Sequence, residues 1–432
     1  MPEANTLTFH NTFTKRREAF VPRTAGAVRM FTCGPSVYRR QHLGNYRTFL
    51  FEDILQRYLE YRGYRVNRGI NFTDVEDKAI EEAKHRGETL TELTRPVIDE
   101  FLDSARRLGI KLPAGEIPRA TTSVEEAVGI IETLVERGHA YHHRGNVYYD
   151  PLTFEGFGEV FGLDMSRWPK RRYRFSRDTY EGLRWNLGDF ILWHGNLADD
   201  GFSWDTRLGR GRPAWNVQDP AMISRVLGYE IDIHCGGIDN VYRHHDYNRA
   251  VMEGVTGTEF CHYWIHGEHL LLEGRKMSKS TGNVIYPADL FEKGYSPETV
   301  RFALIYGHYR TRLNMTDTRL EERSAKLEKL RDLASRTTSP IRAATSRAAT
   351  SRAARPESEA HRSDRIIEEI PRQFTLNMDN DLQVGRAVDD LQGVLEHIVR
   401  RGGTYGLSAD QAARVREHLT GVDSVLGVIF AG

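Results

Sequence analysis

The stretch over residues 27–71 constrains the fold more than any other part of the sequence. Residues 27–33 (AVRMFTC) are mostly apolar and predict a strand that runs into a Gly-Pro turn. Residues 47–62 then carry apolar side chains at helical spacing, Gly63 ends this helix, and residues 64–71 predict a second strand. A strand, a helix and a strand in this order form a βαβ unit of a parallel sheet. We therefore predict an α/β fold.

The remaining sequence divides into segments of different character. Helical spacing predicts helices over residues 73–86, 92–108 and 123–137, and the near-repeat AATSRAATSRAA marks a low-complexity stretch. We predict the first half of a parallel-sheet domain over 1–137, an inserted connective region over 138–213, the second half of the domain over 214–315, a helix leading into a bundle over 316–336, a low-complexity linker over 337–364 and a C-terminal helical bundle over 365–432.

The composition bears on location and partners. Lys and Arg number 60 and Asp and Glu number 60, so no bulk positive field draws the chain to nucleic acid. The sequence has no apolar run long enough to span a membrane, and its first residues lack the pattern of a signal peptide. Three cysteines do not make a disulfide framework. We expect a cytoplasmic protein without a membrane partner.

A short motif, His42-Leu43-Gly44-Asn45, stands where the first strand gives way to a helix. The free N–H groups and partial positive charge of a helix start favour phosphate. Gly44 lets a nucleotide approach the backbone closely, and His42 can donate to a phosphate oxygen. The tetrapeptide alone is a weak signal, because it occurs often by chance.

The run Lys276-Met277-Ser278-Lys279-Ser280 is a stronger signal. Attack on an α-phosphate builds negative charge, which the two ammonium groups can neutralise in the transition state. Upstream, Gly236-Gly237 and Asp239 follow a predicted strand, where glycines permit close approach to a ribose and the carboxylate can bind a hydroxyl. The predicted ATP-binding residues are Gly44, Gly237, Asp239, Ser278 and Ser280.

Together these motifs resemble those of the cysteinyl-tRNA synthetase family, a class I aminoacyl-tRNA synthetase family. The resemblance is carried by MFTCGPSVYRRQHLGNYRTFLFED, NFTDVEDKAI, GRPAW, DIHCGGIDNVYRHHDYN, YWIHGEHLLLEGRKMSKSTGN and FALIYGHYRTRLNMT. It implies a Rossmann-type catalytic domain that activates an amino acid with ATP and Mg2+, giving an aminoacyl-adenylate. The acyl group then normally passes to the 3′-terminal ribose of tRNA.

The resemblance also implies roles for single residues. His42 and Asn45 are expected to contact the ATP phosphates, while Lys276 and Lys279 stabilise the departing pyrophosphate. Asn45 stands where the family has the second histidine of its motif, and asparagine still donates a hydrogen bond. The positions that match the surroundings of the family's amino-acid pocket are Gly34, Thr73 and Trp215.

The family's zinc site is only half present. Two cysteines, a histidine and a glutamate hold zinc in the family, and the thiol of the substrate binds that zinc, which rejects serine. The matching positions are Cys33, Asp219, His244 and Asn248. Cys33 and His244 remain good ligands, Asp219 is a candidate third, and the neutral Asn248 is a weak one. The adjacent His245 and Asp246 are candidate replacements for Asn248.

Two interpretations of this change stay open. In a remodelled pocket, Asp219 and Asn248 bind a polar or cationic side chain in place of a thiol, and such a site rejects substrates that cannot pair with it. In a weakened site, cysteine remains the substrate. We favour remodelling, with Zn2+ binding in doubt.

Where the family continues into a small domain that reads the anticodon, this sequence stops at Gly432. We therefore expect a truncated paralogue without that domain. A truncated relative of the family acylates the amine of a small amino-sugar. The predicted function is ATP-dependent amino-acid activation followed by transfer to a small amine or carrier. One alternative is a reduced cysteine–tRNA ligase. Another is a non-catalytic RNA-binding pseudo-synthetase, against which the intact lysine motif and Asp239 argue.

Basic and aromatic residues alternate over residues 170–175 (KRRYRF), with Arg167, Arg177 and Arg184 nearby. This pattern suits a nucleic-acid end or another anionic acceptor, and equally a solvated basic strand.

Overall fold

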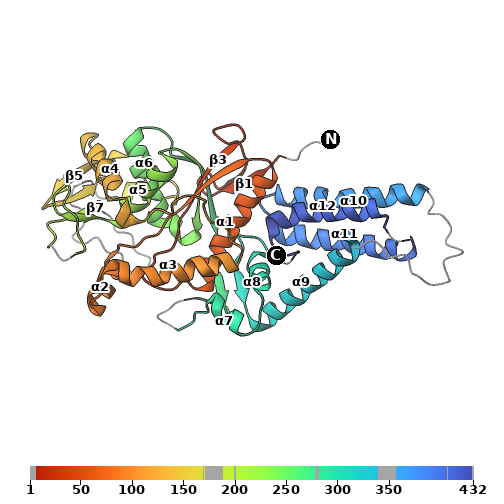
Figure 1. Cartoon of the computed structure of the whole chain (residues 1–432). Helices are drawn as coiled ribbons and strands as arrows, with labels where there is room; N and C mark the ends of the chain where they lie inside the picture. Colours follow the sequence, from red (N-terminus) through yellow and green to blue (C-terminus); the bar gives the residue numbers. More distant parts are fainter. Residues whose placement is uncertain are drawn as a thin grey trace.

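The computed structural model describes residues 6–168, 170, 188–198, 201–277, 282–338, 357–405 and 407–430. Its centre is a four-stranded parallel sheet in the order β10-β9-β3-β4. The bounds of these strands are Cys261–Gly267, Ile231–Gly237, Ala27–Thr32 and Arg65–Ile70. This sheet, with helices packed around it, confirms the predicted α/β fold (Figure 1).

The predicted βαβ unit is β3, α1 (Leu43–Tyr61) and β4. Helix α1 begins at Leu43, four residues before the predicted start at residue 47, because the His42 motif itself opens the helix with His42 as its N-cap. Gly63, with φ at 88°, follows the end of the helix as predicted. Strand β3 also pairs in parallel with β9. The two halves of the domain therefore meet in one sheet, and their strands end at the same edge.

Helices pack around this sheet, and several of them belong to the first half of the domain. The helix expected at residue 73 begins only at Asp77, since Ser36 and Thr73 form an isolated bridge before it. The helix expected at residue 92 begins at Leu90, after a capping box between Thr89 and Glu92. The bounds are Asp77–Arg86 for α2, Leu90–Arg107 for α3, Val124–Glu136 for α4, Trp215–Leu227 for α5 and Asp246–Thr256 for α6. Short helical turns lie at Ala120–Thr122, Pro151–Thr153, Met165–Arg167 and Ile238–Asn240.

A second, antiparallel sheet in the order β5-β6-β7-β8 lies within the segment predicted as an insertion. Its strands are Ala140–His143, Asn146–Tyr149, Phe190–Gly195 and Gly211–Pro213. Tyr149, Trp193 and Val128 of α4 share one buried cluster with Tyr247 of α6, which fixes this sheet to the central domain. Lys170 is the one residue of the basic run 170–175 that the structure describes; Arg177, Arg184 and the side chain of Arg167 also lie outside the described part.

Smaller elements complete the domain. A hairpin of β1 (Thr8–Asn11) and β2 (Arg16–Ala19) precedes the central sheet. A three-stranded sheet in the order β12-β11-β13 carries the first lysine of the lysine motif. The bounds are Leu270–Leu272 for β11, Arg275–Lys276 for β12, Leu313–Met315 for β13, Pro287–Glu292 for α7 and Pro297–Ile305 for α8.

The last helices form a bundle at the end of the molecule opposite β5 and β7 (Figure 1). Their bounds are Asp317–Thr338 for α9, Glu357–Met378 for α10, Val384–Tyr405 for α11 and Ala409–Leu426 for α12. Helices α9 and α10 extend into the predicted linker from both sides, so residues 337–338 and 357–364 are helical, and 339–356 lie outside the described residues.

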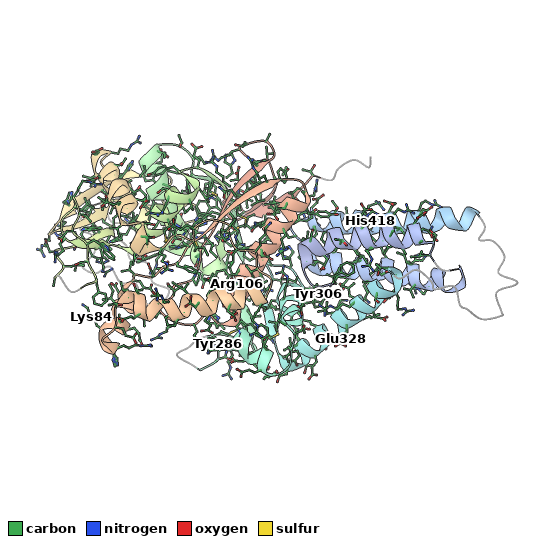
Figure 2. All side chains as sticks on the ribbon, viewed as in Figure 1. Lys84, Arg106, Tyr286, Tyr306, Glu328 and His418 are labelled. Atoms are coloured by element: carbon green, nitrogen blue, oxygen red, sulfur yellow. The ribbon has the colours of Figure 1, made fainter. Side chains whose placement is uncertain are left out.

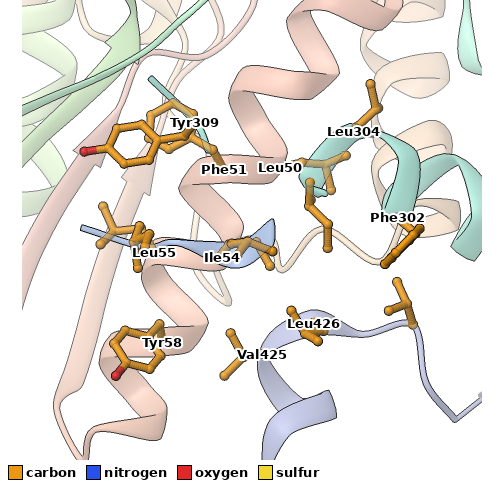
Figure 3. Close-up of a cluster of buried hydrophobic side chains, with 14 of the residues drawn as sticks. Leu50, Phe51, Ile54, Leu55, Tyr58, Phe302, Leu304, Tyr309, Val425 and Leu426 are labelled. Carbon is orange, nitrogen blue, oxygen red and sulfur yellow. The ribbon is translucent and has the colours of Figure 1, made fainter. Parts of the chain in front are cut away.

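The bundle shares its core with the parallel-sheet part of the chain. Side chains of α1, α8 and the end of α12 converge in one buried cluster (Figure 3). Polar contacts also link the bundle to the rest of the chain, and we call this whole interface the joint. Tyr306 (labelled in Figure 2) donates to Asp389 at 2.8 Å, and Lys326 lies 2.6 Å from the same carboxylate. Among the described helices, none is long and apolar enough to cross a membrane.

Candidate functional site

A cavity of about 430 Å3 opens beyond the ends of β3 and β9. This is the edge of a parallel sheet where ligands usually bind, because the strand order reverses there. The residues predicted for the site that line it are Cys33, Gly34, Thr73, Trp215, Asp219, Asp239 and His244. The cavity thus joins residues predicted for the amino-acid pocket to one predicted for the ATP ribose.

Three of the four positions expected to hold zinc come together in the wall of this cavity. The Cys33 Sγ atom lies 3.2 Å from Asp219 Oδ2 and 3.7 Å from His244 Nε2. His244 Nε2 is itself 2.9 Å from Asp219 Oδ2. The fourth position, Asn248, is fully buried with its amide 3.4 Å from His234 Nε2, and it is not one of the residues that line the cavity.

His245 and Asp246, the two candidate replacements for Asn248, have different surroundings. The His245 Nε2 atom lies 3.2 Å from Cys33 Sγ. The Asp246 carboxylate instead accepts hydrogen bonds from the backbone N–H groups of Val160 and Phe161, both at 3.0 Å. Donor atoms of Cys33, His244 and His245 all lie within 4.8 Å of one another. A thiolate, a carboxylate and imidazoles at these separations fit a zinc ion.

Burial sets the protonation of this group. It raises the pKa of the Cys33 thiol well above its ordinary value, and the neighbouring Asp219 carboxylate adds to the rise. Burial also favours a higher pKa for Asp219, but His244 and the Cys33 thiol outweigh it, and the pKa of Asp219 is lowered. Burial lowers the pKa of His245 well below its ordinary value. Asp219 is therefore ionised and His245 neutral at neutral pH; a bound cation would favour the Cys33 thiolate.

Asn71 connects Asp219 to the floor of the pocket. Its Nδ2 donates to Asp219 Oδ1 at 3.0 Å, and its Oδ1 accepts the Gly34 N–H at 2.7 Å. A Cβ atom at Gly34 would lie 1.7 Å from the Asn71 carbonyl oxygen, so only glycine fits there. Asn71 was not among the residues predicted for the site, although a buried polar residue at the carboxyl end of a parallel strand is a recognisable signal.

The His42 motif opens helix α1 and lies close to the segment that follows the lysine motif. The Leu43 N–H, in the first turn of α1, donates to the Ile285 carbonyl at 2.8 Å, so the helix start contacts the segment after the lysine motif. The Asn45 Oδ1 atom accepts the His42 N–H at 3.1 Å and closes the first turn. A Cβ atom at Gly44 would lie 3.0 Å from the His42 ring.

The first lysine of the lysine motif, Lys276, lies beside Asp239, which lines the cavity. The Lys276 Nζ atom lies 3.5 Å from Asp239 Oδ2, and both side chains are more than half exposed, at 60% and 56%. A Cβ atom at Gly237 would lie 2.7 Å from Asp239 Oδ1, so glycine leaves room for this carboxylate. The remaining motif residues, Ser278, Lys279 and Ser280, lie outside the described residues.

Comparisons with known proteins identify tRNA synthetases as relatives of this chain. A family model described as the catalytic domain of class I (C) tRNA synthetases matches residues 19–325. The cysteine–tRNA ligase of Brachyspira hyodysenteriae is 39% identical over 332 residues, which are 76% of this chain and 69% of that protein. The cysteine–tRNA ligase of Chlamydia muridarum is 33% identical over 434 residues, covering 98% of this chain and 88% of its own.

Solved structures share the fold. The methionyl-tRNA synthetase of Mycobacterium tuberculosis in complex with methionyl-adenylate superposes with a TM-score of 0.65 at 14% identity, covering 93% of this chain and 90% of that one. The LeuRS of Agrobacterium radiobacter, in a complex with tRNA, gives a TM-score of 0.64 at 13% identity over 95% of this chain and 85% of that one.

Proposed function

Because the chain belongs to the class I cysteinyl-tRNA synthetase family and is a ligase of the aminoacyl-tRNA synthetase type, we propose that it activates cysteine with ATP and transfers the cysteinyl group to a tRNA. The observation that carries the proposal is a single cavity. Cys33, Asp219 and His244 line one part of it, and Asp239, beside Lys276, lines another. An amino-acid side chain and a nucleotide therefore fit next to each other.

The hydrogen bonds of Asp219 support cysteine as the amino acid. Asp219 Oδ1 accepts from Asn71, and Asp219 Oδ2 is within 3.2 Å of the Cys33 thiol and 2.9 Å of His244. The carboxylate of Asp219 is thus oriented by Asn71 and faces Cys33 and His244, the two other candidate zinc ligands. A zinc ion held by Cys33, Asp219 and His244 would supply a positive charge that favours the thiolate of the substrate.

In the activation step a carboxylate oxygen of cysteine attacks the α-phosphorus of ATP. A new oxygen–phosphorus bond forms, the bond to the bridging oxygen breaks, and pyrophosphate leaves with that electron pair. The partial positive charge at the start of α1, where His42 is the N-cap, favours the phosphates. The Lys276 ammonium group neutralises charge on the departing pyrophosphate, and the Asp239 carboxylate accepts a ribose hydroxyl.

The relatives support tRNA as the acceptor. Proteins named cysteine–tRNA ligase align over 98% of this chain, including the bundle that follows the catalytic half. The small amine or carrier expected from the sequence has no support among these relatives. ATP, as its magnesium complex, and tRNA are thus the proposed substrates besides cysteine.

Pyrophosphate exchange into ATP tests the activation step without any RNA. We expect exchange with cysteine and far less with serine, which lacks the thiol. Replacing Lys276 and Lys279 together by alanine should abolish it. Exchange confined to a different amino acid would refute cysteine as substrate, and absence of exchange with all amino acids would favour the pseudo-synthetase.

Acylation of bulk tRNA with labelled cysteine then tests the acceptor. Cysteinyl-tRNA should form and should release the amino acid on mild alkaline treatment, as an ester does. Robust activation of cysteine together with no acylation of any tRNA would refute the tRNA step and leave the small amine or carrier.

A further inference from the structure

We propose that the metal centre of this chain is completed by two adjacent histidines, so that one thiolate, one carboxylate and two imidazoles hold a single zinc ion. Its ligands are Cys33, Asp219, His244 and His245. The proposal rests on the pocket of the proposed function, but metal binding alone tests it, and metal binding needs no substrate. It departs from the ligand set of the family, in which the position of Asn248 provides the fourth ligand, and it selects His245 from the two replacements that the sequence offers.

The distances fit tetrahedral coordination. Metal–sulfur and metal–nitrogen bonds of about 2.3 and 2.0 Å place sulfur and nitrogen about 3.5 Å apart in a tetrahedron. The Cys33 Sγ atom is 3.2 Å from His245 Nε2 and 3.7 Å from His244 Nε2, which brackets that value. Asp219 lies 3.2 Å from the same sulfur. All three other candidate ligands therefore gather around the one sulfur atom of Cys33, and Asp219 Oδ2 also lies 2.9 Å from His244 Nε2.

The local backbone explains how neighbouring residues reach one sulfur atom. On an α-helix, successive side chains point about 100° apart, because a turn holds about 3.6 residues. His244 and His245 instead end a π-helical turn, Val241–His245, in which Arg243 has φ at 71°. Such turns occur mostly at functional sites, and the positive φ marks a conformation that arginine seldom adopts. Both Nε2 atoms are thereby directed at Cys33.

A chain of hydrogen bonds behind His245 orients its ring. His245 Nδ1 lies 2.7 Å from His266 Nε2, and His266 Nδ1 lies 2.9 Å from Thr12 Oγ1. With a metal on His245 Nε2, its Nδ1–H donates to His266, whose own Nδ1–H then donates to the Thr12 hydroxyl. Metal-bound histidines usually donate their second N–H in this way. A Cβ atom at Gly236 would lie 3.0 Å from the His245 ring, so glycine leaves room for it.

Asn248 is the rival for the fourth position, and its surroundings argue against it. Its side-chain amide lies beside His234. Its Oδ1 atom is buried without a hydrogen-bond partner among the described residues and is therefore open to an ion, but a neutral amide oxygen is a poor zinc ligand compared with an imidazole. The two candidates predict opposite effects of substitution.

Metal binding by single-site variants decides between them, in the absence of ATP, amino acid and tRNA. Zinc content is measured by mass spectrometry, and apoprotein is titrated with Co2+ while the d–d and sulfur-to-cobalt absorption bands are recorded. We expect one tetrahedral ion per chain in the wild type and in Asn248→Ala. His262→Gln, which changes a half-buried histidine paired with Glu259, is the matched control and should also bind normally.

His245→Gln should weaken binding by more than the about 10- to 100-fold expected for the outer-shell variant His266→Gln. Cys33→Ser should remove the sulfur-to-cobalt band. Normal binding by His245→Gln, loss of binding in Asn248→Ala, or a wild type without metal would each overturn the proposal. If circular dichroism shows that His245→Gln is unfolded, a sulfur band that persists in Cys33→Ser would still overturn it. A metal-free wild type that exchanges with cysteine would overturn the metal site alone, whereas a metal-loaded wild type without exchange would overturn only the proposed function.

Discussion

Replacing Arg301 by leucine tests how the bundle is fixed to the catalytic half of the chain. Arg301 is buried, with its side chain 1% exposed, and its guanidinium contacts three separate elements. It lies 2.6 Å from Asp53 on α1, donates to the Leu108 carbonyl after α3 at 3.0 Å, and donates to the Leu426 carbonyl at the end of α12 at 2.6 Å. Loss of this side chain leaves a buried carboxylate and two carbonyls short of donors.

The expected cost follows from these contacts. Removing one partner of a buried ion pair costs about 3–5 kcal/mol, because the other charge stays buried without compensation. Asp53 keeps two other donors, Arg57 at 2.9 Å and the Lys111 N–H at 2.7 Å, so its charge is not left alone. We therefore place the loss in the free energy of unfolding near the lower bound, at about 3 kcal/mol.

The lowered pKa of Asp53 agrees with a stabilising ion pair between Asp53 and Arg301. Burial favours a higher pKa for Asp53, but Arg301, Arg57 and the Lys111 N–H outweigh it, and the pKa of Asp53 is lowered. Burial lowers the pKa of Arg301 as well, in spite of Asp53. The Asp53 direction is the informative one, since the ordinary pKa of arginine is high enough to leave it charged at neutral pH in either case.

Urea unfolding followed by circular dichroism measures this loss from the shift in midpoint at unchanged slope. The control is Arg336→Leu, which removes an exposed pair with Asp332 on α9 and should cost less than about 1 kcal/mol. The double variant Asp53→Leu, Arg301→Leu should lose less than the sum of the two single variants, because neither charge is left unpaired. An Arg301→Leu protein as stable as the Arg336→Leu control would refute the reasoning.

Three further changes test other parts of the site and the joint. Lys276→Ala should lower the rate of pyrophosphate exchange at saturating ATP by about 10²- to 10³-fold, while the urea midpoint stays unchanged, because Lys276 and Asp239 are both largely exposed. Gly34→Ala should abolish exchange with cysteine, since the new Cβ would lie 1.7 Å from the Asn71 carbonyl; full activity would show that the pocket floor is not as described. The folded-state pKa of Asp53 is lowered, so its contribution to stability is complete above the unfolded value of about 3.9 and is lost as the pH falls through the folded value. The melting temperature of wild type should therefore fall more steeply with acid than that of Asp53→Asn, and parallel curves would contradict this.

The sequence predicted the fold because its signals are local. Apolar runs, helical spacing and Gly63 are enough to place β3, α1 and β4, and the pairing of β3 with β4 follows from the rule for βαβ units. The start of α1 was predicted late because the residues of the His42 motif act as a helix cap, which apolar spacing does not reveal. Helix α10 begins inside the predicted linker, where a polar composition hid a helical segment whose Asp364 accepts a hydrogen bond from Gln411 of α12.

The sequence was enough to predict which residues belong to the site, but not how those residues are arranged in space. Resemblance identified Cys33, Asp219 and His244, and the structure places their donor atoms within 3.7 Å of one another. Which of the residues after His244 faces the sulfur depends on a π-helical turn that exists only through tertiary packing. Asn71 was missed for a related reason, since its role depends on two partners far away along the chain.

The altered ligand set bears on how the pocket would treat a thiol. With Asp219 and His245 in place of the second cysteine and the glutamate of the resembling family, the ligands carry one negative charge fewer and one thiolate fewer. A zinc ion in this set is less electron-rich, so an incoming thiolate meets less repulsion and a harder, more acidic metal. The same change weakens retention of zinc, because thiolates are its strongest ligands. The hydrogen bonds of Asp219 to Asn71 and of His245 to His266 offset part of that loss by holding the ligands in place. With zinc in this set, we expect the pocket to keep its preference for a thiol while holding the metal less tightly than the family's own ligands do.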